Sequence, residues 1–321
     1  MNGYHRDIVS PVTAVTVRVP AKVNLQLAVG PVRADGYHDL VTVFHAVSLF
    51  DEVTVSPAAR DSVTVTGEGA GQVPADDSNL AVLAARAVAE VSGPASREVP
   101  GLAIRIRKRI PVAAGLAGGS ADAAATLVAC NELWRSGLGQ PELAELAASI
   151  GSDVAFTLTG GTAVGMGRGE RVTPALTSGS YHWVLAFAHG GLSSAEVYAA
   201  HDRICAAGPD GGQRPALDTA LMTALRSGDA AGLGPLLAND LEPAAISLRP
   251  ELRRTLAAGV EFGVLGAMVC GSGPTCAFLA RSARHARDLA VALAGAGVCR
   301  TVARVTGPAA GAGVRAGTTR P

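Results

Sequence analysis

The sequence predicts a protein of two domains that mixes strands with helices, of the α+β or the α/β class. Its 321 residues suffice for one large domain or two medium ones, and two domains are the better expectation. Segments typical of strands and of helices recur in two successive blocks along the chain. At the centre of the first block, an alternating run from Leu102 to Ile110 precedes a glycine loop and an Ala-rich run from Ala121 to Trp134. This order indicates a strand, a loop and a helix.

The first block opens with strands. Apolar residues alternate from Val15 to Val29, as in a strand with one buried face, so Lys22 and Asn24 should lie on the other face. The pair Asp35-Gly36 favours a tight turn after this strand. Further strand-like segments are 40–47 and 52–55. This part of the chain is therefore predicted to be a β-rich layer.

Helices and one more strand complete the first block. Several N-caps at 76–79 start a helix that extends to about Val91, and a short helix at 141–150 follows the central one. The run 160–170 is predicted to return as a strand with a glycine-rich bend. The first domain is expected to end soon after it.

The second block repeats this mixture. Its expected strands are 181–188, 267–270, 276–279 and 300–305, and its expected helices are 193–202, 217–226, 233–237, 250–259 and 284–294. Residues before Val12 are interpreted as a loose leader and residues 307–321 as a frayed tail. Neither end is expected to matter for activity.

Composition favours a small-molecule ligand. The 27 basic residues balance 27 acidic ones, so no overall field recruits nucleic acid or an anionic membrane. No segment has the apolar core of a signal peptide or the length of a membrane span, which argues against secretion and membrane insertion. The five cysteines are odd in number and lack C-x-x-C spacing, so we expect buried thiols in a reducing cytoplasm.

The glycine loop is the strongest chemical signal in the chain. It reads Pro111-Val112-Ala113-Ala114-Gly115-Leu116-Ala117-Gly118-Gly119-Ser120-Ala121. Its glycines allow a ligand to approach closely, and the N-terminus of the following helix favours an anion such as phosphate. The loop is neither a P-loop nor a dinucleotide fingerprint and has no lysine, so a triphosphate would need a metal ion and cations from elsewhere. Close packing of a helix on a strand explains the same glycines equally well.

Two loops together resemble a known family. Residues 111–122 look like the ATP motif of the GHMP small-molecule kinases, and Gly271-Ser272-Gly273-Pro274 looks like their C-terminal glycine loop. Further matches resemble the branch of this family whose acceptor is the cytidine diphosphate conjugate of methylerythritol. They are Ala21-Lys22-Val23-Asn24-Leu25, Asp35-Gly36-Tyr37-His38, Gly151-Ser152-Asp153-Val154, Gly160-Gly161-Thr162 and Gly167-Arg168-Gly169-Glu170. These matches extend over most of the chain, in the expected order.

The resemblance implies a two-domain α+β fold. Its N-terminal ATP-binding domain, at 1–175, would be similar to domain 2 of ribosomal protein S5, and its C-terminal domain, at 176–321, would be ferredoxin-like. The implied activity is ATP-dependent phosphorylation of the 2-hydroxyl of the methylerythritol unit, with Mg²⁺, in the non-mevalonate isoprenoid pathway of the cytoplasm. The partner is then a small molecule and neither nucleic acid nor membrane, while the oligomeric state is left open.

By resemblance, Lys22 and Asp153 form the catalytic pair. Phosphoryl transfer asks a protein mainly for positioning and charge stabilisation. Asp153 would orient the attacking hydroxyl or accept its proton, and Lys22 would stabilise charge on that oxygen and on the phosphoryl group. From the residues alone, a solvated lysine on a strand face and a capping carboxylate after a helix are the simpler interpretations.

The resemblance also places the ATP phosphates against the loop 111–121. Ser120 then offers a hydroxyl to a phosphate or to Mg²⁺. Asp122 would repel a bare triphosphate from its place in the helix, so it either faces away or lies near the metal. Asn79 is expected to contact adenine or to be an ordinary N-cap.

For the acceptor, Tyr37 and Tyr198 are expected to stack on cytosine and His38 to hydrogen-bond the edge of the base. Stacking on an aromatic ring contributes about 1–3 kcal/mol per base in nucleic-acid systems. The alternative for Tyr198 is a core position on its helix. Asn24 is expected to bind hydroxyls or phosphates, and Gly271-Ser272-Gly273 to line the cleft as an anion nest.

Two departures from the family pattern bear on the loop and on the catalytic segment. Ala113, Ala114 and Ala117 replace glycines common in these loops, and we expect them to adopt negative φ as the loop enters the helix. Ala155 stands where the family has proline. The competing interpretations are another GHMP kinase, acting on homoserine, mevalonate or a sugar, and a non-catalytic nucleotide-binding protein of the same fold.

Overall fold

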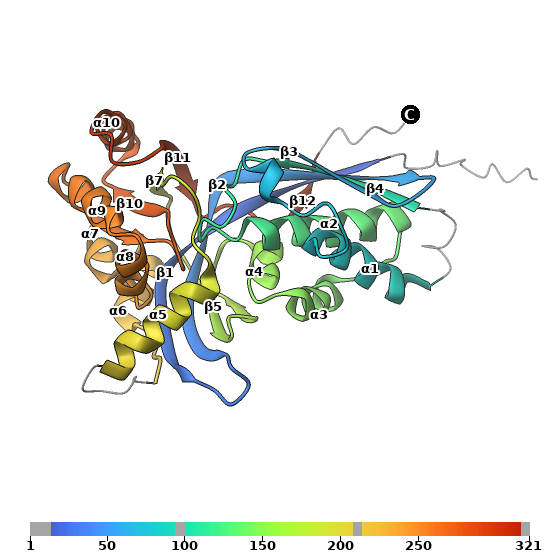
Figure 1. Ribbon diagram of the computed structural model, residues 1–321, viewed down its shortest axis with the longest axis horizontal. Coiled ribbons are helices and arrows are strands. Elements are labelled where there is room, and N and C mark those ends of the chain that lie inside the picture. The colour runs from blue at the N-terminus through green and yellow to red at the C-terminus, as the bar shows by residue number, and fades with distance from the viewer. Residues whose placement is uncertain (1–13, 94–100, 208–213, 316–321) are drawn as a thin grey trace, which may run out of the picture.

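The computed structural model describes residues 14–93, 101–207 and 214–315. They form two blocks, each with its own sheet (Figure 1). Both sheets are mainly antiparallel and carry helices, which is the α+β arrangement that the sequence predicts. The expected leader lies outside the described residues.

The N-terminal sheet is built on two long strands, β1 (Val15–Val32) and β2 (His38–Ala58). The strand order is β12-β1-β2-β4-β3, and β5 and β6 extend it from β2 while β8 pairs with β1. These strands are β3 (Ser62–Gly67), β4 (Gly101–Lys108), β5 (Thr162–Gly167), β6 (Arg171–Pro174), β8 (Ala238–Asn239) and β12 (Gly313–Val314). β1 therefore lies at the centre of the molecule, where both of its faces are covered.

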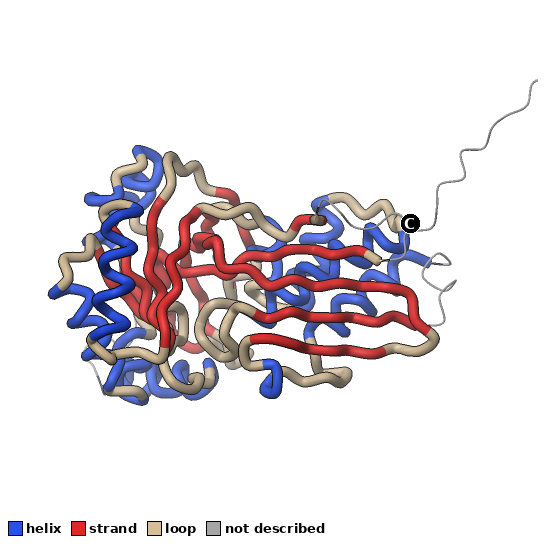
Figure 2. The backbone as a smooth tube through the Cα atoms, turned by 90° about the horizontal axis from the view of Figure 1, so that it is seen from above, coloured by secondary structure: helices blue, strands red, loops and turns tan. Residues whose placement is uncertain are grey.

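Four helices cover one face of this sheet, as Figure 2 shows. They are α1 (Leu80–Ser92), α2 (Gly118–Trp134), α3 (Gln140–Ile150) and α4 (Val154–Thr159), and a 3₁₀ turn, η1 (Ala70–Gln72), precedes them. Every residue from Ala121 to Leu127 of the Ala-rich helix α2 is buried, because its small side chains let it approach β1 and β2 closely. Its N-terminus is thereby fixed next to the glycine loop.

The C-terminal block has a four-stranded antiparallel sheet in the order β11-β7-β10-β9. These strands are β7 (Tyr181–Phe187), β9 (Gly266–Val269), β10 (Cys276–Ala280) and β11 (Thr301–Gly307). The helical elements of the block are α5 (Ser194–Ala207), α6 (Thr219–Ser227), α7 (Ala230–Leu233), η3 (Gly234–Leu236), α8 (Glu242–Leu248), α9 (Glu251–Glu261) and α10 (Ala283–Gly295). α9 and α10 pack on this sheet, and β11 contacts β2 of the other block.

Several elements differ from the sequence-based expectation. The two strand-like segments 40–47 and 52–55 belong to one strand, β2, because β1 pairs on both sides of the stretch between them, across a register shift that leaves residues 48 and 49 without Cα partners in β1. The short elements β3, β6, α4, α8 and β12 were not expected. The expected frayed tail is wrong for residues 307–315, because Gly307 ends β11, Ala310 bridges Gly160, and Gly313 and Val314 pair with β1.

The cysteines and helices can be compared with the expectations of buried thiols and of no membrane span. All five cysteines are unpaired, and Cys130, Cys270 and Cys276 are buried as expected, whereas Cys205 and Cys299 are partly exposed. Among the described residues, no helix combines the length and the apolar character that a membrane crossing needs.

One buried histidine lies where the two blocks meet. His45 of β2 is fully buried, and its ring contacts the rings of Tyr181 and Trp183 of β7 at centroid distances of 5.6 and 6.1 Å. Its Nδ1 lies 2.8 Å from the Thr162 hydroxyl. Burial lowers the pKa of His45 to about 3, so the ring is neutral in the folded protein at neutral pH.

We expect His45 to make the fold sensitive to acid. In the unfolded chain His45 binds a proton below its ordinary pKa of 6.5, whereas in the folded protein it stays neutral down to about pH 3. The free energy of unfolding therefore falls as the pH decreases from 6.5 towards 3. The slope due to this residue approaches about 1.4 kcal/mol per pH unit. Urea unfolding of wild type and His45→Gln between pH 7 and 4 measures it. The stability difference between the two proteins should shift in favour of the variant as the pH falls, and a difference independent of pH would contradict the assignment.

Candidate active site

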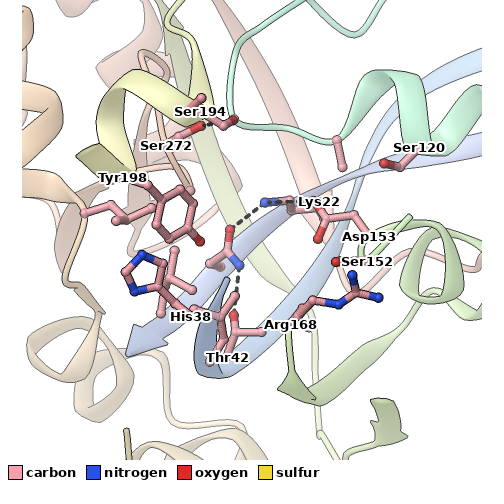
Figure 3. A pocket seen from close by; sticks show the side chains of 18 of the residues that line it. Lys22, His38, Thr42, Ser120, Ser152, Asp153, Arg168, Ser194, Tyr198 and Ser272 are labelled. Atoms are coloured by element: carbon pink, nitrogen blue, oxygen red, sulfur yellow. Dashed lines mark hydrogen bonds and ion pairs between the residues drawn. The ribbon is translucent and has the colours of Figure 1, made fainter. Parts of the chain in front are cut away.

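A cleft of about 780 Å³ lies between the two blocks (Figure 3). It is lined by β1, β2, both glycine loops, the start of α4 and one side of α5. Of the sequence-predicted site residues, the lining contains Lys22, Asn24, Tyr37, His38, Ala113, Ala114, Gly115, Ala117, Gly118, Gly119, Ser120, Asp153, Tyr198, Gly271 and Ser272. The structure therefore brings together most residues that the sequence predicts for the site.

The remaining predicted residues lie around this cleft. Asn79, Pro111 and Val112 line a cavity of about 170 Å³ that shares Gly118 and Gly119 with the cleft. Leu116 and Ala121 are buried in the core, and Gly273 packs close to Val269. These last three positions shape the two loops rather than the surface of the cleft.

Lys22 and Asp153 point toward each other across the cleft (Figure 3). Lys22 Nζ lies 3.6 Å from Asp153 Oδ2, and the lysine side chain is only 6 % exposed while that of the aspartate is 30 % exposed. The interpretation of Lys22 as a solvated lysine is thus wrong. Asp153 is the residue before α4, but its side chain makes no capping hydrogen bond. The interpretation of Asp153 as a capping carboxylate is therefore wrong. The carboxylate is accessible from the cleft and balanced by one ammonium.

A polar chain on β1 and β2 holds the lysine in place. The Lys22 ammonium donates to Asn24 Oδ1 at 2.7 Å, and Asn24 Nδ2 donates to the Thr42 hydroxyl at 2.8 Å. Thr42 in turn donates to the Gln26 carbonyl at 2.7 Å. Both polar groups of the Asn24 side chain are therefore hydrogen-bonded to neighbouring side chains, Oδ1 to Lys22 and Nδ2 to Thr42. The expected contact of Asn24 with the acceptor stays a prediction.

The two glycine loops contact each other beside this pair. A Cβ at Gly115 would collide with the Cys270 carbonyl, and a Cβ at Gly271 would lie 3.1 Å from Lys22 Nζ. Both glycines also have positive φ, at 75° and 51°. The Lys22 amide donates to the Leu116 carbonyl at 3.2 Å, which joins β1 to the first loop. Only glycine permits this approach, so the two loops and β1 form one wall.

The backbone of the first loop corrects one expectation. Ala113 and Ala117 have φ of 49° and 60°, in the left-handed region, although negative values were expected. Only Ala114 of the three replacing alanines is free of positive φ. The bends that bring the loop back into α2 require left-handed geometry, and an alanine there costs about 1–2 kcal/mol relative to right-handed backbone.

Asp122 faces away from the cleft, into the core beneath the loop. Lys108 Nζ lies 2.6 Å from Asp122 Oδ2 and 2.5 Å from Asp51 Oδ2, and it also donates to the Gly118 carbonyl at 3.1 Å. Asp51 Oδ1 accepts the amides of Arg109 (2.5 Å) and Ile110 (2.9 Å). This triad of Lys108, Asp51 and Asp122 fixes the strand end, the first glycine of α2 and the helix to one another.

The triad also sets the electrostatic charge beneath the first glycine loop. Burial raises the pKa of Asp122 to about 8, although Lys108 opposes the shift and Asp51 adds to it. For Lys108, burial alone lowers the pKa, but the two carboxylates outweigh it and the net shift is upward. The lysine therefore stays charged and offsets the charge of the Asp122 carboxyl, whose raised pKa also favours uptake of a proton. The carboxyl group near the helix N-terminus then adds little repulsion toward an anion.

Aromatic and charged side chains line the other end of the cleft. The ring of His38 stacks on that of Tyr198 at 5.1 Å, and His38 Nδ1 lies 2.8 Å from the Gly30 carbonyl. His38 Nδ1 must therefore carry the hydrogen, because a carbonyl only accepts. Burial, and to a lesser degree Asp153, raises the pKa of Tyr198, so its hydroxyl remains a donor. Tyr198 is thus part of the cleft lining and not only a core residue.

Tyr37 and two charged residues complete this end. Tyr37 is 52 % exposed, and the guanidinium of Arg168 lies 4.8 Å from its ring centroid. Asp202 Oδ1 lies 3.5 Å from His38 Nε2. Arg168 and Asp202 both line the cleft, so this end carries a cation and an anion beside the rings.

Asn79 is the N-cap of α1. Its Oδ1 accepts the Ala81 amide at 2.9 Å, and its Nδ2 donates to the Pro74 carbonyl at 2.6 Å. Of the two roles expected for Asn79, an adenine contact or an ordinary N-cap, the structure shows the N-cap. It also lines the smaller cavity, and a contact with adenine stays a prediction.

Two family models match the chain. One, described as the GHMP kinases N terminal domain, matches residues 79–161, and the other, described as GHMP kinases C terminal, matches residues 221–299. The first match contains the first glycine loop and Asp153, and the second contains Gly271. This chain is a member of the GHMP kinase family.

Relatives of this GHMP kinase match nearly its full length. Proteins from Thermobifida fusca, Nocardia farcinica and Mycobacterium tuberculosis are 56 %, 57 % and 52 % identical to it. The matches cover 94 %, 94 % and 98 % of this chain and 98 %, 96 % and 96 % of the relatives. All three are named 4-diphosphocytidyl-2-C-methyl-D-erythritol kinase.

Solved structures agree with the family. A crystal structure of a 4-(cytidine 5'-diphospho)-2C-methyl-D-erythritol kinase, 33 % identical, superposes with a TM-score of 0.73 over 90 % of this chain and 98 % of that one. A homoserine kinase from Cytophaga hutchinsonii has a TM-score of 0.70 at 19 % identity, over 98 % of this chain and 100 % of that one. The second likeness shows the fold alone.

The metal expectation can be compared with the residues of this GHMP kinase. Among the described residues, no three His, Cys, Asp or Glu side chains gather as a metal site. The cleft does present the Ser120 hydroxyl and the partly exposed Asp153 carboxylate, which are oxygen donors of the kind that Mg²⁺ prefers. They fit an ion that arrives on phosphates, because Mg²⁺ keeps several waters and needs only one or two protein ligands.

Sequence reasoning missed four side chains of this site. Lys108 has a signal that could have found it, because it occupies the buried register of the strand between Ile106 and Ile110. Arg168 stands in a matched glycine-rich motif, and a cation at such a bend suggests an anionic ligand. Thr42 and Asp202 carry no such signal, since their roles depend on pairing of β1 with β2 and on docking of α5.

We expect Ala117→Gly to stabilise the protein. The substitution removes the left-handed penalty at φ 60° but loosens the unfolded chain, for a net gain of about 0.5–1 kcal/mol in the free energy of unfolding. The matched control, Ala114→Gly in the same loop, should destabilise by about 1 kcal/mol, because Ala114 is buried and has no positive φ. Chemical denaturation of both variants measures this, and equal losses would contradict the strained geometry.

The triad predicts a contrast between two conservative changes. Lys108→Met leaves the buried Asp51 carboxylate without its cation and should destabilise by about 3–5 kcal/mol. Asp122→Asn keeps an acceptor for the lysine and mimics the protonated acid, so it should cost less than about 1 kcal/mol. Urea midpoints at pH 7 measure both. A severe loss in Asp122→Asn would show that the ionised carboxylate is needed.

Proposed function

We propose that this GHMP kinase transfers the γ-phosphoryl group of ATP to the 2-hydroxyl of 4-diphosphocytidyl-2-C-methyl-D-erythritol. The products are the 2-phosphate of that conjugate and ADP, in the non-mevalonate isoprenoid pathway. The observation that carries the proposal is identity of 52–57 % over nearly the whole length of relatives that bear this enzyme's name. The unpaired cysteines fit the reducing cytoplasm that we propose as its location.

Asp153 and Lys22 supply the proposed chemistry. The Asp153 carboxylate, partly exposed in the cleft, orients the attacking hydroxyl and accepts its proton as the oxygen–phosphorus bond forms. The Lys22 ammonium, 3.6 Å away, stabilises negative charge on that oxygen and on the phosphoryl group in flight. Because Asn24 and Thr42 fix the ammonium, little reorganisation is needed during transfer.

The first glycine loop binds the triphosphate in this proposal. The N-terminus of α2 directs free amides and a positive partial charge toward the loop, and Lys108 offsets the charges of Asp51 and Asp122 beneath it. Ser120 offers its hydroxyl to a phosphate or to Mg²⁺. Mg²⁺, when bound with ATP, neutralises phosphate charge and aligns the γ-phosphate.

The far end of the cleft suits the cytidine diphosphate. Tyr37 and Tyr198 present ring surfaces for cytosine, and His38 lies against Tyr198 with its Nε2 toward Asp202. Arg168 supplies a cation for the diphosphate beside Tyr37. Gly271 and Ser272 close the cleft from the second block, where the Ser272 and Ser194 hydroxyls lie 2.8 Å apart. A conjugate with a base at one end and a hydroxyl near Asp153 would span this length.

The other acceptors of the family find no comparable support. The homoserine kinase structure shares only 19 % identity and shows the fold alone. Homoserine has no base, so it would leave the rings and Arg168 unused. A non-catalytic role is disfavoured, because the Lys22–Asp153 pair is intact and reaches the cleft.

We expect Asp153→Asn to lower kcat by about 10²–10⁴-fold, because the amide cannot accept the proton of the hydroxyl. Coupled ADP release with ATP, Mg²⁺ and the cytidine diphosphate conjugate measures this. The matched control is Asp288→Asn on the exposed side of α10, which should stay within twofold of wild type. No acceptor-dependent ADP release by wild type, or turnover of homoserine instead, would contradict the proposed substrate.

A further inference from the structure

Residues 308–312 form a strap between the two blocks. The strap leaves β11 of the C-terminal sheet and leads to β12, which pairs with β1 at the edge of the N-terminal sheet (Figure 1). Ala309 donates its amide to the Ala46 carbonyl at 2.9 Å and accepts the Gly161 amide at 2.7 Å. The chain is therefore held at this crossing by hydrogen bonds to β2 and to the segment after α4.

The strap completes the C-terminal end of α4. This helix has only six residues, and helices of that length are not stable alone. Its last carbonyls need partners from outside the helix. The Ala312 amide supplies them, at 3.1 Å from the Thr157 carbonyl and 3.2 Å from that of Leu158. The helix thus depends on a contact from a residue more than 150 positions later in the chain.

Glycines make this contact possible. A Cβ at Gly311 would collide with the Leu158 carbonyl, and a Cβ at Gly160 would collide with the Gly311 amide. Gly160 also has a φ of 68°. Any side chain at Gly311 would therefore lift the strap from α4. By contrast, a Cβ at Gly313, in β12 beyond the strap, has its nearest neighbour at 3.9 Å.

The same helix positions Asp153 and the phosphate loop. Thr157 donates its amide to the Asp153 carbonyl at 3.0 Å. Its hydroxyl lies 3.1 Å from that carbonyl and 3.2 Å from the Ser120 carbonyl. Thr157 is thus capped by the strap on one side and connects Asp153 to the start of α2 on the other.

We propose that the strap is a positioning element for Asp153. It holds α4 in register so that the carboxylate stays opposite Lys22 and at a fixed place relative to Ser120. Residues 308–312 are absent from the lining of the cleft, and their contact with the segment that carries Asp153 is made through α4. The inference rests on the proposed function, in which Asp153 is the group that receives the hydroxyl proton.

The test compares Gly311→Val with its matched control Gly313→Val. We expect Gly311→Val to lower kcat at least tenfold and to change the KM for ATP less than threefold, since the first glycine loop is held by other contacts. Gly313→Val should keep kcat within twofold of wild type. Wild-type kcat in Gly311→Val would overturn the inference while leaving the proposed function intact. Inactive wild type would instead overturn the proposed function.

A double-variant cycle separates positioning of Asp153 from general loosening. In an Asp153→Asn background, adding Gly311→Val should lower the residual rate less than twofold, because no carboxylate remains to be misplaced. The same tenfold loss in both backgrounds would overturn the inference. If Gly311→Val does not fold, Ala312→Pro removes the amide donor without a larger side chain at Gly311. The same results are expected for Ala312→Pro as for Gly311→Val, and the same loss in both backgrounds would overturn the inference.

Discussion

The close approach of the two glycine loops is the constraint on which the rest of the structure depends. Gly115 lies against the carbonyl of Cys270, where no Cβ fits, and Gly271 lies beside the ammonium of Lys22, where a Cβ would be crowded at 3.1 Å. The contact joins the N-terminal block to the C-terminal block where the middle of β1, the N-terminus of α2 and the end of β9 lie beside the cleft. It fixes the walls of the cleft before any ligand binds. A preorganised cleft suits phosphoryl transfer, which asks mainly for alignment and fixed charges.

The two buried lysines of the site, Lys108 and Lys22, lie in different electrostatic environments. Lys108 is enclosed with two aspartates and supports the phosphate loop from beneath, where its charge is cancelled. Lys22 has one partly exposed carboxylate partner, and Asn24 holds it toward the cleft. The first lysine therefore serves the shape of the site, and we propose that the second serves its chemistry. The difference follows from position alone, because Lys108 continues the buried register of β4 and Lys22 lies on the cleft face of β1.

The sequence predicts the main elements and the site where local patterns are strong. Alternation predicted β1, and the glycine loop with its Ala-rich run predicted the start of α2, whereas the pairing of Lys22 with Asp153 was expected only from the resemblance to the family. The left-handed φ of Ala113 and Ala117 could not be predicted, because alanine rarely adopts it and only the tertiary contacts of the loop impose it. The strap was mistaken for a frayed tail for a similar reason. Its Gly-rich composition resembles a tail, and its order comes from hydrogen bonds to residues 148 to 263 positions earlier in the chain.

The central claim is that Lys22 and Asp153 act on one hydroxyl of the acceptor while the first glycine loop holds the triphosphate beside it. A crystal structure with a non-hydrolysable ATP analogue, Mg²⁺ and the cytidine diphosphate conjugate tests it most directly. The account predicts the 2-hydroxyl oxygen within hydrogen-bond distance of the Asp153 carboxylate, in line with the γ-phosphorus, and the triphosphate on residues 111–121. A 2-hydroxyl remote from Asp153, or a triphosphate bound away from that loop, would contradict it.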